Sequence, residues 1–191
     1  MRYLIGEDHI GRGACRLDRL EGDEFDYALF DGVPRAADFP SDARFRMNDS
    51  FPEDLRTEDF ISNITSALVV SARTRELLGG AALPHNEFLP VDIINHKGRK
   101  ERGPFFILHQ VDLQDCIDFE RTVCTRNAID PALLSSVEQL VLDEGRIHTQ
   151  APIFRLKYFP YAPMFREDIV EQIHAAGLTG IRFTEPSRFT Y

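Results

Sequence analysis

Residues 153–183, IFRLKYFPYAPMFREDIVEQIHAAGLTGIRF, decide the fold that we expect for this chain. Their first six residues alternate between two sets of side chains, which predicts a strand with one buried face. Phe154 and Arg155 fall on opposite faces of that strand. Pro160 and Pro163 are expected to end it, because proline has no N–H to donate to a neighbouring strand.

A helix is expected next, over residues 166–176. Ile169, Val170 and Ile173 recur at helical spacing and form one apolar stripe. Gly177 stands where a helix commonly ends, because glycine readily adopts the left-handed backbone conformation found there. A short strand follows, so this stretch predicts a strand–turn–helix–strand unit.

A second unit of the same kind is expected nearer the middle of the chain. Ser71 is a good N-cap for a short helix over residues 72–78, preceded by the apolar stretch 67–70. The stretches 88–95 and 104–111 predict a hairpin. Two strand–helix–strand units and a hairpin indicate an α+β fold, a mixed sheet with short helices packed on it.

The length of 191 residues predicts one domain over residues 1–191. Residues 1–60 form a less regular acidic part, and residues 60–184 form the core. The net charge is −9, and residues 1–60 carry 8 Lys or Arg against 15 Asp or Glu. Such an acidic surface repels nucleic acid and anionic lipid and attracts basic partners, although acidity also serves solubility alone.

The sequence predicts a cytoplasmic location. Neither a signal peptide nor an apolar run long enough for a membrane span is expected. The three cysteines, Cys15, Cys116 and Cys124, are odd in number and follow no spacing pattern. They fit reduced thiols in a cytosol.

Few residues point to catalysis. Cys116 and His109 could form a nucleophile and base, but a structural histidine in an apolar strand is the better interpretation of His109. The acidic residues around Asp112 lack the spacing of calcium or zinc ligands, so no metal and no cofactor is expected. Nucleotide-binding glycine motifs and a basic patch interleaved with aromatic residues are also missing.

Four stretches in a fixed order resemble one known family: residues 104–120, 140–143 and 153–156, followed after a helix by residues 177–183. The most specific pieces are the Asp-Cys-Ile-Asp run within 104–120 and the Gly-Leu-Thr-Gly that opens 177–183. The chain resembles a bacterial immunity-protein family first described from a myxobacterial member and formerly classed as a domain of unknown function. This resemblance covers about residues 60–184.

The resemblance implies an α+β protein, not an enzyme, that neutralises a cognate bacterial toxin of a polymorphic toxin system by protein–protein binding. It supplies no catalytic residues. Two alternatives stay open, a small cytosolic hydrolase that uses His109 and Cys116, and an adaptor that binds a partner without inhibiting it.

The toxin-binding site is expected in the acidic N-terminal third, where aromatic side chains stand among carboxylates. Such a combination is typical of interface hot spots. The same pattern also fits a solvated acidic loop whose aromatic residues turn into the core. The expected binding residues are Asp18, Glu21, Asp23, Glu24, Phe25, Asp26 and Tyr27.

A second choice combines two acids with a basic hairpin loop. Asp112 and Asp115 follow the second strand of the hairpin, and the loop joins its two strands. A charged hairpin tip is usually just solvated, so this site ranks second. The basic residues of the loop are Lys97, Arg99, Lys100 and Arg102.

Overall fold

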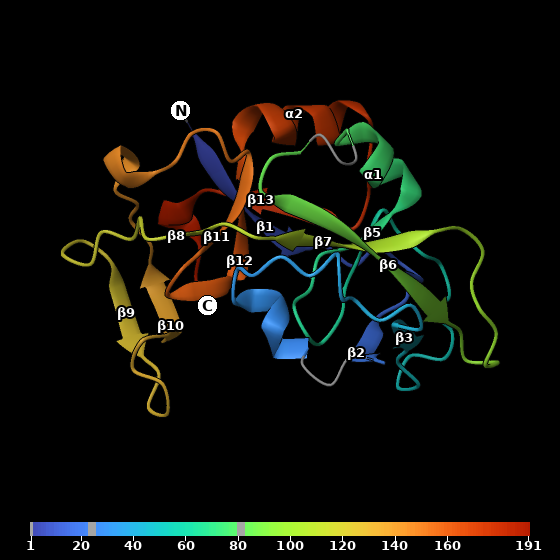
Figure 1. Ribbon diagram of the computed structural model, residues 1–191. Coiled ribbons are helices and arrows are strands. Elements are labelled where there is room, and N and C mark those ends of the chain that lie inside the picture. The colour runs from blue at the N-terminus through green and yellow to red at the C-terminus, as the bar shows by residue number, and fades with distance from the viewer. Residues whose placement is uncertain (1, 23–25, 80–82) are drawn as a thin grey trace.

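The computed structural model describes residues 2–22, 26–79 and 83–191 and is mostly β (Figure 1). The described structure is 38% strand and 13% helix, so the expected α+β class is wrong. Three sheets replace the single mixed sheet with helices packed on it. Most of the additional strands lie outside the two units and the hairpin that the sequence predicted.

The first sheet has five strands and gathers both ends of the chain. β11 pairs with β12 and with β8, so its backbone is bonded on both sides. In spatial order the strands are β13 (Ile181–Thr184), β1 (Tyr3–Asp8), β12 (Phe159–Arg166), β11 (Ile153–Leu156) and β8 (Leu113–Gln114).

The second sheet has six strands, and the third is a hairpin of two. The hairpin consists of β9 (Val123–Arg126) and β10 (Leu134–Gln139) and stands at the left edge of Figure 1. The six strands, in spatial order, are β2 (Leu17–Glu21), β3 (Arg44–Met47), β6 (Asn86–Ile94), β7 (Phe105–Gln110), β5 (Val69–Ser71) and β4 (Phe60–Ile61).

Two α-helices, α1 (Ala72–Leu77) and α2 (Glu167–Ala175), lie together at the top of Figure 1. The Ser71 cap is confirmed, because its hydroxyl oxygen accepts a hydrogen bond from the Thr74 N–H. Gly177 has φ of +61°, as expected at a helix end. No helix in the described part of the chain is long and apolar enough to cross a membrane. The described residues also include three short 3₁₀ helices, η1 (Asp26–Phe30), η3 (Glu144–Arg146) and η4 (Pro186–Arg188).

Pro160 and Pro163 do not end a strand, contrary to expectation. The chain turns at Lys157 and Tyr158 and returns as β12, which contains both prolines. The ladder is irregular here, since its register shifts between Arg155 and Leu156. A proline is tolerated where the ladder needs no N–H from that residue.

Gly180 lies where the two large sheets meet. The N–H of Phe60 donates to the Thr179 carbonyl oxygen at 2.9 Å, which ties β4 to the loop before β13. A Cβ atom at Gly180 would lie 1.8 Å from the Phe60 carbonyl oxygen, and its φ is +90°. Only glycine fits this position, which explains the last residue of the Gly-Leu-Thr-Gly run.

Candidate functional site

The residues considered for catalysis are buried and separated. His109 is 1% exposed, and its Nε2 atom lies 2.8 Å from the Val33 carbonyl oxygen. Burial lowers the pKa of His109, which keeps the ring neutral. Cys116 is fully buried, and burial raises its pKa to about 12. Within the described ranges no hydrogen bond joins the two side chains, and no cluster of three or more His, Cys, Asp or Glu could hold a metal ion.

Thiol labelling tests this burial. We expect only Cys124, which is partly exposed, to react in the native protein, because the thiolate is the reactive form and burial also raises the pKa of Cys15 to about 12. The measurement is intact mass after brief treatment with iodoacetamide, with and without guanidinium, and Cys124→Ser should take no native label. Rapid labelling of Cys116 would contradict the prediction and restore the enzyme alternative.

The first-choice acidic segment is only partly described. Asp23, Glu24 and Phe25 lie outside the described residues, and Asp26 and Tyr27 begin η1. Asp18 and Glu21 lie on β2.

Glu21 does not act as a free negative charge. Its carboxylate accepts hydrogen bonds from Arg46 Nε at 2.8 Å and from Arg44 Nε at 2.9 Å. These hydrogen bonds lower the pKa of Glu21, and the one from Arg46 has the larger effect. The segment is therefore less negative than its sequence indicates.

The second-choice residues are not brought together. The β6–β7 loop lies at the right end of Figure 1, and β8, followed by Asp115, lies on the left. In the loop, Lys100 forms an ion pair with Asp92 at 2.6 Å. Asp115 accepts hydrogen bonds from Arg146 and from the Tyr158 hydroxyl. These charges therefore form two separate surfaces.

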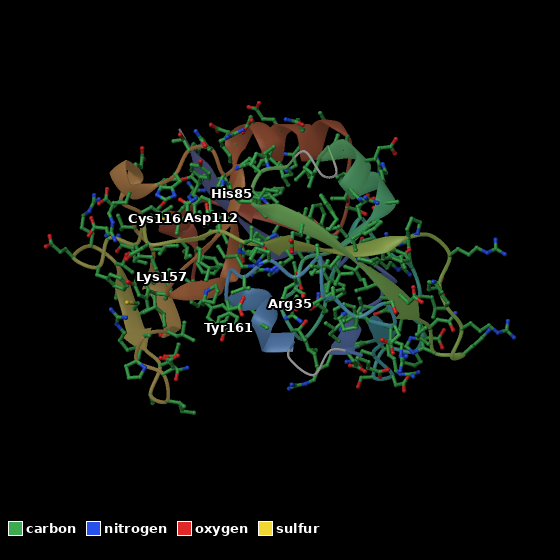
Figure 2. All side chains as sticks on the ribbon, viewed as in Figure 1. Arg35, His85, Asp112, Cys116, Lys157 and Tyr161 are labelled. Atoms are coloured by element: carbon green, nitrogen blue, oxygen red, sulfur yellow. The ribbon has the colours of Figure 1, made fainter. Side chains whose placement is uncertain are left out.

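A surface groove of about 660 Å³ lies between η1 and the β9–β10 hairpin. Lys157, from the turn between β11 and β12, and Tyr161, on β12, line this groove and are labelled in Figure 2. The loop after β4 closes a further side. We call this feature the groove, and its main lining residues are Phe30, Asp31, Ile64, Asp130, Lys157 and Tyr161.

The groove combines apolar side chains with charges of both signs. Ile64 is 59% exposed and Tyr161 is 39% exposed, and the ring of Tyr161 lies 5.7 Å from that of Phe30. Asp31 and Lys157 also line a neighbouring hollow of about 650 Å³ that reaches Asp115. Exposed aromatic and aliphatic groups bordered by charges are typical of protein-binding hot spots.

The side chain of Arg155 connects the segments that line the groove. It is 2% exposed, and its Nε atom donates to Gln110 Oε1 at 2.7 Å. Its other nitrogens donate to the carbonyl oxygens of Pro160 and of Ser66, and its guanidinium lies 4.9 Å from the centroid of the Phe30 ring. These contacts connect β7, the β11–β12 hairpin, the loop after β4 and η1.

Arg155 carries its charge without an acidic partner. Among the described carboxylates none forms an ion pair with it. Burial lowers its pKa to about 9, which is still above neutral pH, so the side chain is cationic at pH 7. The alternation of residues 153–158 predicts that Arg155 lies on the strand face opposite Phe154, and it does not indicate a functional role. All four residues of β11 are in fact buried, because the strand is covered on both faces.

The side chain of Asn63 fixes the loop that presents Ile64. Its amide nitrogen donates to the carbonyl oxygens of Ala67 at 2.7 Å and Ile61 at 3.1 Å. Its amide oxygen accepts from the Ala67 N–H and from both the N–H and the hydroxyl of Thr65. Ile64 is therefore held in an exposed position by polar contacts behind it. The sequence signal that could have identified this site is an asparagine directly before an aliphatic residue in a loop.

The comparison with family models gives one relevant match. Residues 4–187 match the model described as Immunity protein family (Imm11). Comparison with curated proteins gives no match. The match confirms the resemblance stated from the sequence and also covers most of residues 1–60, where that resemblance was weakest.

Proposed function

This chain belongs to the Imm11 immunity protein family, and from that premise we propose that it binds and neutralises a cognate bacterial toxin. The toxin would belong to a polymorphic toxin system, and the complex would form in the cytoplasm by protein–protein contact without catalysis. The family match over residues 4–187 is the observation that carries this proposal.

The groove is the proposed toxin-binding surface. Its exposed Ile64 and Tyr161 provide an apolar centre, and Asp31, Asp130 and Lys157 provide a charged border. A standard interface buries about 1,600 Å² in total, which is larger than the groove, so we expect the contact to extend over its walls. The net charge of −9 favours a basic toxin, because opposite charges accelerate association.

We also include the acidic segment of residues 18–27 in the proposed contact, and we call it the acidic border. It leads into η1, the last residue of which, Phe30, lines the groove. Glu21 is a less suitable test residue, because Arg44 and Arg46 hold it. Asp23 and Glu24 are the residues to change.

Co-purification tests the proposed function as a whole. The protein would be expressed with the C-terminal domain of the product of the neighbouring open reading frame, and survival and complex formation would be scored. We expect the chain to restore growth and to elute with the toxin domain at a fixed ratio. Restored growth without any complex would contradict neutralisation by binding and favour an enzyme.

Charge reversal tests the acidic border. We expect Asp23→Lys with Glu24→Lys to slow association about 10-fold at low salt and to flatten its salt dependence, because steering acts on the on-rate. The measurement is binding kinetics at two salt concentrations.

The matched control for charge reversal is Glu76→Lys with Glu171→Lys. It changes the net charge by the same amount on α1 and α2, on the opposite side of the molecule from η1 in Figure 1. Equal slowing by both pairs would show that total charge, and not this border, controls association.

A further inference from the structure

The tip loop of the β9–β10 hairpin, residues 127–133, is fixed by its own hydrogen bonds. The side-chain oxygen of Asn127 accepts from the N–H groups of Ile129 at 2.8 Å and Asp130 at 3.0 Å. The backbone N–H of Asn127 donates to the Leu133 carbonyl oxygen at 2.9 Å. Asp130 Oδ1 accepts from the Ala132 N–H at 3.0 Å. This loop is ordered by polar contacts and not by packing of its apolar residue.

Ile129 at the end of this loop is 96% exposed, the largest value among the exposed large apolar residues in the described part of the chain. A single exposed aliphatic residue is ordinary on protein surfaces. Ile129 differs because its backbone is already held in one conformation, which reduces the entropy cost of binding. Its loop neighbours Asp130 and Leu133 also line the groove.

The base of the hairpin is anchored to the body of the protein. Leu134 and Val137 on β10 are each 1% exposed. The N–H of Leu134 donates to the Tyr158 carbonyl oxygen at 2.8 Å, and Val137 and Tyr191 exchange two backbone hydrogen bonds at 3.0 and 2.8 Å.

A ring contact braces the β9 side of the hairpin. The Arg126 guanidinium lies 4.5 Å from the centroid of the Phe119 ring, and its Nη1 atom donates to the Pro131 carbonyl oxygen at 3.3 Å. The hairpin is therefore a braced arm with a fixed tip.

We propose that this arm inserts Ile129 into an apolar recess of the toxin, beside a basic group that meets the exposed Asp130 carboxylate. The inference rests on the proposed function and adds the anchor residue and the chemistry of its receptor. The same arrangement recurs across the groove, where Asn63 fixes the loop that exposes Ile64. The two asparagine-braced loops border one groove and present an isoleucine each.

The test compares Ile129→Asp, Ile129→Leu and the unchanged protein for binding to the purified toxin domain. We expect Ile129→Asp to weaken binding about 30-fold, mainly through faster dissociation, because a hot-spot side chain is lost. Ile129→Leu should retain most of the affinity. Melting temperatures should be equal, because Ile129 is almost entirely exposed.

The control is Leu55→Asp, an aliphatic residue that is 52% exposed and does not line the groove. Unchanged affinity of Ile129→Asp for a toxin that binds the unchanged protein would overturn the anchor and leave the proposed function standing. A toxin-free dimer that Ile129→Asp dissociates would assign the loop to self-association and also overturn it. Absence of binding by the unchanged protein would overturn the proposed function and the anchor together.

Discussion

Arg155→Ala is expected to lower the free energy of unfolding by about 4 kcal/mol. The substitution removes the donor from three oxygens, on Gln110, Pro160 and Ser66. An unsatisfied buried acceptor costs about 1–3 kcal/mol, and relief from burying the cation offsets part of the sum. The melting temperature should fall by roughly 10 °C in a thermal scan.

Lys157→Ala is the matched control for Arg155→Ala. Lys157 is a basic residue two positions later, and its side chain is exposed. We expect its free energy of unfolding to change by less than about 0.5 kcal/mol. If Arg155→Ala melts like Lys157→Ala, Arg155 does not hold the groove together.

Ile64→Arg is expected to weaken toxin binding about 100-fold. The change removes an apolar contact from the centre of the groove and places a cation where a basic toxin would approach. Stability should hardly change, because Ile64 is 59% exposed and Asn63 fixes the loop through its own side chain. The measurement is titration calorimetry with the toxin domain, beside a melting curve.

Leu55→Arg separates the groove from general effects of an added cation. Leu55 is also aliphatic and is 52% exposed, but it lies outside the groove. We expect it to bind the toxin with nearly unchanged affinity. A similar loss of toxin affinity for Leu55→Arg and Ile64→Arg would show that net charge causes it and that the groove is not part of the interface.

Local elements with strong terminal signals were predictable from the sequence. The helices at residues 72–77 and 167–175 were recognised from the Ser71 cap, from apolar periodicity and from Gly177. These signals act within one turn of helix, so a single sequence contains them.

The architecture was not predictable, because it depends on contacts far apart in the chain. The alternation of residues 153–158 indicated one buried face, but β11 lies between β12 and β8 and is covered on both faces. Arg155 can be buried there only because oxygens of Gln110 and Ser66, both far away in the chain, and of the nearby Pro160 accept its hydrogen bonds. No local pattern shows that such acceptors are present.

The groove was missed for the same reason. Its lining residues come from β2, η1, β12 and several loops, spread along the chain from Arg19 to Tyr161. None of these segments has an unusual sequence when it is considered alone. The sequence did contain two usable signals, Asn63 before Ile64 and Asn127 before Ile129. Both are asparagines that fix a loop and leave an aliphatic side chain exposed. The acidic composition predicted a binding site at residues 18–27, which lead into η1, one wall of the groove.

Amide hydrogen exchange with and without the toxin domain tests most directly whether the groove is the binding surface. We expect slower exchange on binding in residues 62–67, 127–133 and 157–161, and no change in α2 or in residues 95–103 of the β6–β7 loop. We also propose that residues 1–191 form one domain. Amides outside the groove and the acidic segment of residues 18–27 should exchange at the same rates in both states. Slower exchange in residues 95–103, with unchanged exchange along the groove, would contradict the account.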